Sequence, residues 1–371
     1  MRPLRITAAA ALTAGAVLAA LPAHADPPAS APPSASTLST SSTSGASSSE
    51  IVVSPTGDPA AAGTAAAPTT LTAAIDRAGP GTTIRLSPGI YHGPIRTVRA
   101  GTQTEPITIT GPETGFDPAQ RRQAVLYGTG RIVAIDHSWI HLRGFTIDGQ
   151  ERLAAAQVAM PTDLAGADAW KAEHQNLIDD SRLVYIGADE ASRDITGILI
   201  ADMLLTGAGG ECVRLRNNAH ANVITDNLIR NCGLYGKDAP AGTDRSRWHN
   251  GEGVYLGTST RSTTQPLPGN DRTSGNWVWH NVIQTYGSEA VEAKEQATGN
   301  IVGYNYLGAN TEAGAKGAIL AFRSSGNWAI GNTLVGSLGT SIRTAADPGY
   351  TATDNTITAN TTTDIATTDV P

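Results

Sequence analysis

The sequence predicts an all-β protein whose short strands stack into a parallel β-solenoid. Four segments align without gaps and share Asn at the first and sixth positions and an apolar residue at the eighth: NVITDNLIRN (222–231), NWVWHNVIQT (276–285), NIVGYNYLGA (300–309) and NWAIGNTLVG (327–336). Their starts lie 54, 24 and 27 residues apart, so the first interval is either two repeats or one repeat with insertions. So short a repeat has no room for the helix of an α/β unit and is too small for a propeller blade. Glycine is abundant (40 residues) and charged residues make up only 16% of the chain, which also argues against a helical protein.

A second strand is expected before each repeated segment. The four candidates are GECVRLR (210–216), GEGVYLG (251–257), SEAVEAK (288–294) and KGAILAFR (316–323). Each unit then consists of strand, turn, strand and turn, and forms one rung whose inward side chains continue the core of the next. Asparagine tolerates left-handed turns, and stacked Asn side chains can hydrogen-bond from rung to rung. We therefore expect these asparagines to be structural: Asn227, Asn281, Asn305, Asn332 and Asn355.

The N-terminal part fits the same design. Strands are expected around Ile51 and Ile84. Between them, residues 70–78 predict a short amphipathic helix, which would cover the open end of the solenoid. Its apolar face would consist of Leu71, Ala74, Ile75 and Ala78.

This stretch resembles the opening of the right-handed parallel β-helix proteins of the pectate-lyase-like superfamily. The matching residues are Ser54-Pro55-Thr56-Gly57, Leu71, Ala74-Ile75-Asp76, Gly79–Ile84 and Pro88–Tyr91. The resemblance covers most of residues 51–360. It implies an all-β, right-handed parallel β-helix with a short N-terminal capping helix and insertion loops that flank a groove. It specifies fold far better than reaction, because one fold hosts many activities.

The first 50 residues predict export. Arg2 and Arg5 precede an apolar run that ends in a small-residue cleavage site, which indicates a signal peptide over residues 1–25; a lone membrane anchor is the alternative. Residues 26–50 are almost entirely Pro, Ala, Ser, Thr and Gly and predict a flexible linker. Residues 51–371 would then form the β-helix domain of a secreted, monomeric protein without membrane contact.

Charge and cysteine usage limit the partners and the compartment. The net charge is -7 with no basic block, which argues against a nucleic-acid partner. Cys212 and Cys232 can form a disulfide in an exported chain, with two buried thiols as the alternative.

Insertions mark a groove. The repeat is interrupted at residues 150–196, 234–250 and 258–275, and the last two intervals flank the strand GEGVYLG on its two sides. Loops on either side of one strand build a groove along that face of the sheet. Trp248 and His249 of the first flanking loop would line this groove as substrate-binding residues. His249 could also carry a proton, with an ordinary surface or turn residue as the alternative.

Strand parity sorts the residues of this face. Small apolar residues are expected to point inward in matched columns: Val213/Leu215, Val254/Leu256, Val291/Ala293 and Ile319/Ala321. The outward columns are then Arg214/Tyr255/Glu292/Leu320 and Arg216/Gly257/Lys294/Phe322. Arg214, Arg216 and Tyr255 are therefore predicted to bind substrate.

A further column contains Glu211, Glu252 and Glu289. Strict alternation would point these carboxylates inward, which is costly, so they are expected at the bend before each strand. They either accept hydrogen bonds from turn N–H groups and pair with arginines, or hold a cation between them.

The rung SEAVEAK and the following AFRSSG resemble the chondroitinase B and alginate lyase family of β-helix enzymes. In that family a strand carries two glutamates and a lysine, and an arginine follows one rung later. The resemblance implies that Glu289 and Glu292, with Asn281 or a neighbour, bind calcium, that Lys294 is the base, and that Arg323 assists catalysis. The match departs from the family in the spacing of the glutamates and in Ser324 after the arginine.

Three functions remain open at this point. The first is a polysaccharide lyase that cleaves an acidic, uronate-containing polymer by β-elimination, which needs a base and a cation to stabilise developing charge. Glu292 and Glu295 would raise the pKa of Lys294 and oppose this role, whereas calcium, Arg216 or Arg323 would lower it; a solvated salt bridge is the alternative for Lys294.

The second function is a glycoside hydrolase that uses Glu252 and Glu292, or Glu289 and Glu292, as its carboxyl pair. The third is a non-catalytic carbohydrate-binding solenoid, in which aromatic side chains would stack on sugars. Those side chains are Trp248, Tyr255, Trp277, Trp279, Tyr286 and Trp328. Trp277 and Trp328 share a column of the repeat, which favours a structural role for these two.

Overall fold

The computed structural model describes residues 49–112, 123–162, 167–187, 194–234, 251–263, 267–309, 318–336 and 340–363. The predicted signal peptide, most of the predicted linker, Trp248 and His249 lie outside these residues. The first strand, β1 (Glu50–Val53), pairs with β2 (Thr83–Leu86).

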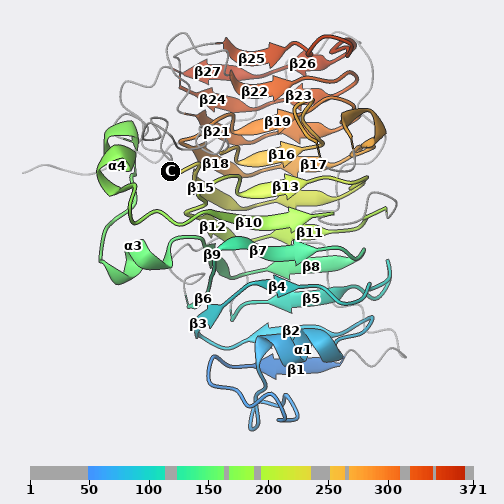
Figure 1. Cartoon of the computed structure of the whole chain (residues 1–371). Coiled ribbons are helices and arrows are strands. Elements are labelled where there is room, and N and C mark those ends of the chain that lie inside the picture. The colour runs from blue at the N-terminus through green and yellow to red at the C-terminus, as the bar shows by residue number, and fades with distance from the viewer. Residues whose placement is uncertain are drawn as a thin grey trace, which may run out of the picture. The chain divides into compact units, whose positions relative to one another are not determined.

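The strands form three parallel sheets, here called sheets 1, 2 and 3, which run along the stack (Figure 1). Sheet 1 has ten strands: β1, β2, β5 (Ile107–Thr110), β8 (Ile140–Arg143), β11 (Leu199–Ala201), β14 (Val223–Thr225), β17 (Trp277–Trp279), β20 (Ile301–Gly303), β23 (Trp328–Ile330) and β26 (Thr356–Thr358). Sheet 2 has nine: β3 (Gly89–His92), β6 (Ala124–Tyr127), β9 (Thr146–Asp148), β12 (Leu204–Thr206), β15 (Leu228–Cys232), β18 (Val282–Thr285), β21 (Tyr306–Ala309), β24 (Thr333–Val335) and β27 (Thr361–Thr363). Sheet 3 has eight: β4 (Ile95–Arg96), β7 (Gly130–Ile135), β10 (Ser181–Ile186), β13 (Val213–Leu215), β16 (Val254–Leu256), β19 (Val291–Ala293), β22 (Ala318–Phe322) and β25 (Thr340–Thr344).

Each rung has three strands and not the two that the sequence predicted. The repeated segment is divided into a sheet 1 strand and a sheet 2 strand by a residue with left-handed backbone, as at Asp226 (φ 55), His280 (φ 52) and Tyr304 (φ 53). The long first interval is one rung with insertions, because β14 pairs directly with β17. The Thr-rich C-terminal region adds β26 and β27, which are the sheet 1 and sheet 2 strands of a last rung.

The repeated asparagines form two buried ladders. In the ladder between sheets 1 and 2, Asn281 Oδ1 accepts from Asn227 N (3.1 Å) and Nδ2 (2.9 Å), while Asn281 N donates to Asn305 Oδ1 (2.8 Å). The second ladder precedes the sheet 1 strands and includes Asn327. Asn355 belongs to this second ladder, because its Oδ1 accepts from Asn327 N (2.8 Å), and the first ladder ends instead at Asn360.

Replacing Asn305 by Ala should lower the free energy of unfolding by about 2–4 kcal/mol, because several buried partners lose their hydrogen bonds at once. Its Nδ2 donates to Val278 O (2.8 Å) and Asn332 Oδ1 (3.0 Å), and its Oδ1 accepts from Asn281 N (2.8 Å). Denaturant unfolding measures the effect. Asn270→Ala, at an exposed asparagine, is the control, and equal stability of the two variants would contradict a ladder that holds the rungs together.

Apolar side chains fill the interior and the N-terminal helix covers its end. Helix α1 (Leu71–Arg77) begins at the N-cap Thr70, whose side chain accepts from Ala73 N, and buries its predicted apolar face. Cys212 and Cys232 form a disulfide with a Cα–Cα distance of 5.4 Å, which decides between the two predicted states. A disulfide is typical of an oxidising compartment. Among the described residues, no helix has the length and apolar character needed to span a membrane.

The predicted register of sheet 3 is correct for three rungs and wrong by one residue in the fourth. Val291 pairs with Leu320 and Ala293 with Phe322, so Leu320 and Phe322 point into the core. Glu292 therefore has Ala321, not Leu320, beside it. The strand is apolar throughout, so alternation could not identify its inward face. The correction places Arg323 directly after Phe322, in the column of Lys294, and Arg323 N donates to Ala293 O (2.8 Å).

The insertion predicted over residues 150–196 contains helices α3 (Glu151–Ala155) and α4 (Ala167–His174) and also strand β10 of sheet 3. Its helical part is attached beside the turn between sheets 2 and 3, where buried Lys171 Nζ donates to Tyr286 O (2.6 Å). Of the two loops predicted to flank the groove, residues 235–250 lie outside the described part, and the other contains the short 3-10 helix η3 (Pro268–Asn270).

Candidate functional site

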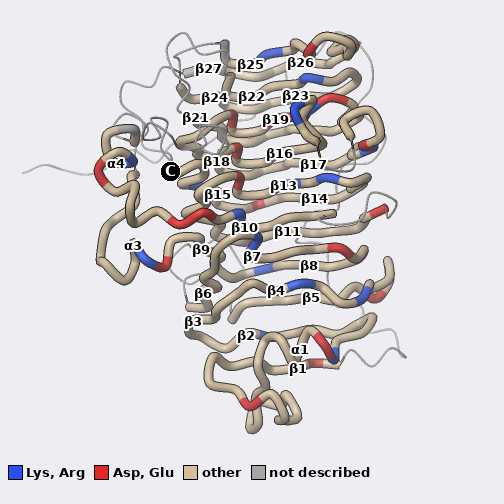
Figure 2. Tube along the Cα trace, in the orientation of Figure 1, with Lys and Arg blue, Asp and Glu red and all other residues tan. Residues whose placement is uncertain are grey.

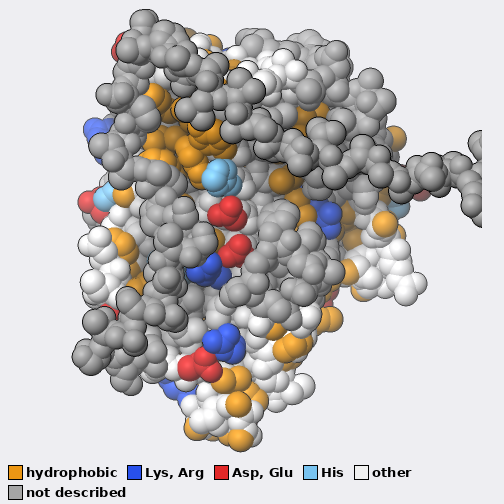
Figure 3. Space-filling view, turned by 180° about the vertical axis from the view of Figure 1, so that it is seen from behind, with side chains coloured by type: hydrophobic (Ala, Val, Ile, Leu, Met, Phe, Trp, Pro, Cys, Tyr) orange, Lys and Arg blue, Asp and Glu red, His pale blue; other side chains and the backbone are white. Residues whose placement is uncertain are grey.

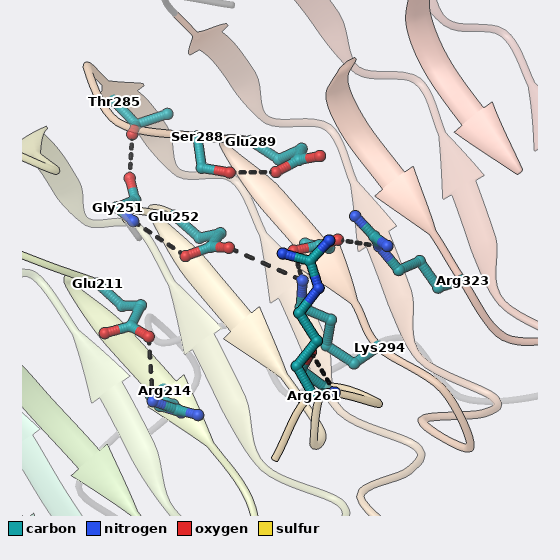
Figure 4. Close-up of polar contacts among 12 residues, drawn as sticks. Glu211, Arg214, Gly251, Glu252, Arg261, Thr285, Ser288, Glu289, Lys294 and Arg323 are labelled. Carbon is teal, nitrogen blue, oxygen red and sulfur yellow. Dashed lines mark hydrogen bonds and ion pairs between the residues drawn. The ribbon is translucent and has the colours of Figure 1, made fainter. Parts of the chain in front are cut away.

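A column of glutamates stands at the start of sheet 3, with each residue two positions before its strand, as predicted. Acidic positions line up from rung to rung on the chain trace (Figure 2), and the close-up shows Glu211, Glu252 and Glu289 one above another (Figure 4). Glu211 follows the structural alternative, because it pairs with Arg182 (2.6 Å) and Arg214 (3.0 Å). Glu252 and Glu289 do not pair with arginine in the described contacts. They instead meet a third carboxylate from strand β19.

The third carboxylate is Glu292, and oxygens of Glu252, Glu289 and Glu292 all lie within 4.8 Å of one another. All three residues are buried. Glu252 Oε2 accepts from Gly251 N (3.1 Å), and Ser288 Oγ hydrogen-bonds Glu289 Oε2. Glu292 Oε2 is buried and has no hydrogen bond of normal geometry, although a lysine lies against it. We call Glu252, Glu289 and Glu292 the carboxylate group.

Two cations enclose the carboxylate group from the next positions of the outward columns. Lys294 Nζ contacts Glu292 Oε2 and lies 4.0 Å from Glu252 Oε1. Arg323 Nε donates to Glu292 Oε1, and its NH1 lies 3.5 Å from Asp347 Oδ1. Glu292 therefore joins the lysine of one rung to the arginine of the next (Figure 4). The outward direction predicted for Glu292 and Lys294 is correct, but both are buried and not solvated.

Burial and charge separate the pKa values of these carboxyls. Burial and the neighbouring carboxylates hold the pKa of Glu252 well above its usual range, although Lys294 opposes the shift. Burial and Glu292 also raise the pKa of Glu289. Burial alone would raise the pKa of Glu292, but Lys294 and Arg323 outweigh it and lower this pKa to about 2.

The same ion pair decides the state of the lysine. Burial alone would lower the pKa of Lys294, but Glu292, Tyr255 and Glu252 outweigh burial and raise it. Lys294 is therefore protonated in the free protein at neutral pH. It can act as a base only after positive charge has been brought to the carboxylate group.

The chelator-treated protein should be most stable near pH 4.5–5. The unfolded carboxyls titrate near 4.5. Glu292 has a depressed folded pKa, so its contribution is present above 4.5 and is lost as pH falls toward 2. Glu252 and Glu289 have raised folded pKa values, so their contribution is present below 4.5 and is lost as pH rises through those values.

Urea unfolding of the chelated protein across pH 3–9 tests this expectation. Glu252→Gln should flatten the loss of stability on the alkaline side, since it removes the carboxyl with the strongly raised pKa, and exposed Asp354→Asn should not. Stability that rises steadily from pH 5 to pH 8 in the chelated wild type would be the opposite result.

The aromatic residue predicted to face the groove lies between two cations. Arg214 lies over the Tyr255 ring at 4.6 Å from its centroid, and Lys294 Nζ at 4.9 Å. Burial raises the pKa of the Tyr255 phenol. The phenol is therefore neutral and can donate a hydrogen bond at neutral pH. Arg214 also pairs with Glu211, so its first role in the free protein is to hold Tyr255 and Glu211 in place.

Arg216 anchors the groove-flanking loop. Its Nε donates to Thr258 Oγ1 (2.9 Å) and its NH2 to Ser262 Oγ (2.6 Å). The same loop is tied to a later rung, because Thr260 Oγ1 donates to Asp347 Oδ2 (2.6 Å). Asp347 thereby links the loop to Arg323.

Asn281 is not a metal ligand, which corrects the prediction for this residue. Its Oδ1 accepts two hydrogen bonds from Asn227, and its Nδ2 donates to Ile224 O (2.8 Å). Both lone pairs of the amide oxygen are thus used within the ladder. Glu252 takes the third position in the carboxylate group instead. Tyr286 is also excluded as a sugar-stacking residue, because it is 1% exposed.

The chain shows no sequence match that would name its reaction: no protein-family model and no curated protein matches it. Among solved structures, it is similar to an alginate lyase from Paenibacillus sp. str. FPU-7, with 15% identity, a TM-score of 0.53, and coverage of 86% of this chain and 98% of the other. This chain shares the fold of that alginate lyase. Weaker similarities include a pectate lyase (12% identity, TM-score 0.45, coverage 85% and 80%) and a lacto-N-biosidase from Eubacterium ramulus (14%, 0.33, 85% and 68%). At identities this low, the structural similarity confirms the right-handed parallel β-helix fold and nothing finer.

Sequence reasoning missed two residues around the site, Asp347 and Arg261, and considered a third, Glu295, only as a neighbour of Lys294. Asp347 reaches Arg323 from a loop that carries no repeat signal. The side chain of Arg261 extends from the flanking loop toward Lys294 and Arg323 (Figure 4). Glu295 is 1% exposed, and neither of its carboxylate oxygens has a hydrogen-bond partner. Of the three, only Glu295 had a signal, since it ends the charged run that begins at Glu289.

Proposed function

We propose that this protein is a secreted polysaccharide lyase that cleaves a uronate-containing polymer by β-elimination on the outward face of sheet 3. The observation that carries the proposal is the placement of Lys294 between the carboxylate group and Tyr255, with Arg323 one rung further. Structural similarity to an alginate lyase supports the fold on which such a site can stand. Export through residues 1–25 and a monomeric state belong to the same proposal.

The reaction removes the proton alpha to the uronate carboxylate and breaks the bond to the leaving sugar. Negative charge builds up on the carboxylate as the proton leaves, so a cation beside it stabilises the transition state. Arg323 and Arg261 are placed to contact a substrate carboxylate. Arg323 pairs with Glu292 of the carboxylate group, and the exposed Arg261 points toward the same group from the flanking loop. Lys294 in its neutral form would take the proton, a carbon–carbon double bond would form as the bond to the leaving oxygen breaks, and the Tyr255 phenol would give its proton to that oxygen.

The carboxylate group fits a calcium ion. Calcium prefers oxygen ligands, and Glu252, Glu289 and Glu292 offer three carboxylates close together, one with a buried oxygen that lacks a hydrogen bond of normal geometry. Bound calcium would supply positive charge that neutralises the substrate carboxylate and lowers the pKa of Lys294. We therefore include calcium in the proposal, with Glu252 in place of Asn281.

Calcium should raise the melting temperature of the chelated protein by about 4 °C or more at a concentration 100-fold above its dissociation constant. Thermal unfolding at pH 7.5 with and without calcium measures the shift. Glu289→Gln should abolish it, whereas Asp354→Asn at an exposed carboxylate should retain it. An unchanged melting temperature in the wild type would remove calcium from the proposal, and Arg261 and Arg323 would then have to supply the positive charge that Lys294 needs to act as a base.

A hydrolase is the second candidate, and one observation favours it. Two carboxyls with raised pKa values, Glu252 and Glu289, stand beside one with a lowered pKa, Glu292. Such a separation is typical of an acid and nucleophile pair. Against it, Glu292 is held by Lys294 and Arg323, which would weaken it as a nucleophile.

Product analysis separates the candidates. The purified protein would be incubated with alginate, polygalacturonate, rhamnogalacturonan and chondroitin sulfate, with calcium and with chelator. We expect at least one acidic polymer to give unsaturated products that absorb in the ultraviolet. Reducing ends without that absorbance would establish the hydrolase. No product from any polymer, together with retardation in gels that contain it, would establish a binding protein.

A further inference from the structure

Aromatic side chains gather on a different sheet from the carboxylate group. Strands β17 and β23 of sheet 1 carry Trp277, Trp279 and Trp328 on their outward sides, and the turns that follow β17 and β20 carry His280 and Tyr304. We call these five residues the aromatic patch. Figure 3 looks onto this side of the molecule and shows hydrophobic side chains gathered beside an exposed histidine, with acidic side chains below it. Earlier rungs of sheet 1 carry other residues at the matched positions, such as Thr225 beside Trp279.

Four of the five rings, those of Trp277, Trp279, His280 and Tyr304, form one connected surface. Trp279 lies 5.4 Å from Trp277 and 4.7 Å from Tyr304 between ring centroids, and His280 lies 5.9 Å from Tyr304. Tyr304 is 51% exposed. The two tryptophans are partly exposed. A surface of this kind presents apolar ring faces and polar ring edges together, as in surfaces that bind sugars.

Glycines in the next rung leave the space that two of these rings occupy. A Cβ at Gly303 would be 2.2 Å from the Trp279 ring, and a Cβ at Gly331 would be 2.7 Å from the Tyr304 ring. Each ring therefore lies against bare backbone of the following rung, and its other side faces outward. Because the turns that carry His280 and Tyr304 lie directly beside the Asn281 and Asn305 ladder, the rings are mounted on a rigid part of the fold.

The spacing of the patch matches an extended polymer that lies along the axis. Trp277 and Trp328 occupy one column, with Ile301 between them. Two rungs correspond to about 9.5 Å, from the usual distance between neighbouring strands. That is close to the length of a disaccharide in an extended polysaccharide, so alternate sugar rings would meet successive tryptophans.

The charges around the patch favour a neutral polymer. None of its five residues is Lys or Arg, and His280 faces Asp226 at 3.9 Å. Asp202, one rung before Asp226, is paired with Arg143 at 3.0 Å. The Asp226 carboxylate would repel a polyanion here, and the patch contains no arginine or lysine that could bind the polyanion. A neutral sugar can donate hydroxyl hydrogen bonds to the same carboxylate.

We propose that the aromatic patch binds a neutral polysaccharide along the axis of the β-helix. This binding surface is separate from the site on sheet 3 and does not depend on the function proposed for it. With both surfaces, the aromatic patch would hold the protein on a neutral matrix polymer while the site on sheet 3 acts on an acidic polymer.

Affinity electrophoresis of the full chain tests the inference, with gels that contain hydroxyethyl cellulose, galactomannan or polygalacturonate. We expect retardation by at least one of the two neutral polymers. Tyr304→Ala should weaken it at least about fivefold, as expected for the loss of one stacked ring. Trp328→Ala provides a second test at a ring that does not contact the other four in the described contacts. Ile90→Ala is the matched control, because Ile90 is also a strongly exposed apolar residue but lies on sheet 2, outside the patch.

Two results from the gels would overturn the inference: no retardation by either neutral polymer, with or without retardation by polygalacturonate, and neutral-polymer retardation that Tyr304→Ala and Trp328→Ala leave unchanged. A concentration-dependent dimer that Tyr304→Ala dissociates would also overturn it, because the patch would then be covered by a second copy. Melting temperatures of all variants confirm that they remain folded.

Discussion

Lys294→Met is expected to lower kcat/KM on the responsive uronate polymer by about 10³-fold, the range lost when a positioned general base is removed. Lys294 Nζ contacts Glu292 of the carboxylate group and lies 4.9 Å from the centroid of the Tyr255 ring, and Met keeps most of the length of the lysine without its charge. The unsaturated product, followed by ultraviolet absorbance, measures the change. Binding of the polymer should persist, so the loss should appear in kcat more than in KM.

Arg85→Gln is the matched control for Lys294→Met. It also removes a paired cation from an outward column, but on sheet 1, where Arg85 and Glu50 form an exposed pair at 2.9 Å. Its activity should equal that of the wild type. Full activity of Lys294→Met, at an unchanged melting temperature, would remove the base assignment and leave the lysine as a structural partner of Glu292.

Glu292→Gln is expected to lower the free energy of unfolding by about 3–5 kcal/mol, because it leaves the buried Lys294 and the partly buried Arg323 without the negative charge that lies between them. Lys294 Nζ and Arg323 Nε both contact the Glu292 carboxylate. After the substitution, Lys294 keeps only Glu252 at 4.0 Å and Arg323 only Asp347 at 3.5 Å among the ion pairs of the described residues. Denaturant unfolding at pH 7 measures the loss.

A double-mutant cycle gives Glu292→Gln its control. If the loss comes from the uncompensated lysine, Lys294→Met should restore part of the stability in the double variant, with a coupling energy of about 1–3 kcal/mol. Additive losses would show that the two residues do not stabilise each other. In that case the close contact between them would have no energetic meaning, and the raised pKa of Lys294 would need another cause.

The architecture was accessible to sequence reasoning because it repeats. Matched Asn and apolar positions at 24 and 27 residue intervals identified the rungs, and the N-terminal helix followed from its apolar spacing. Reasoning from the repeat failed where its signal was degenerate. In β22 every residue is apolar, so the inward face could not be identified. The left-handed turn inside each repeated segment has no common residue type, as Asp226, His280, Tyr304 and Gly331 show, so two short strands appeared as one.

The site was less accessible because it depends on contacts between rungs. The run from Glu289 to Glu295 was singled out as charged, Glu292 and Lys294 were assigned to its outward side, and the column of Glu252 was recognised. The proximity of Glu252 and Glu292 follows from the pairing of β16 with β19, which the sequence had in the right register, whereas the place of Arg323 beside Glu292 requires the corrected register of β22. Burial was also outside the reach of the pattern, since alternation distinguishes core from outside but cannot show what covers an outward face.

The sequence by itself determined the class of fold, the stacking asparagines, the capping helix and the face of sheet 3 that carries charge, because each of these follows from local spacing. Only the tertiary structure decided the pairing of Cys212 with Cys232, the place of Asn281 in a ladder, and the union of three glutamates around one lysine. These depend on which rung lies beside which across insertions of unequal length. They depend equally on burial, which is the largest cause of the raised pKa values of Glu252 and Glu289 and cannot be read from the residues beside them in the chain.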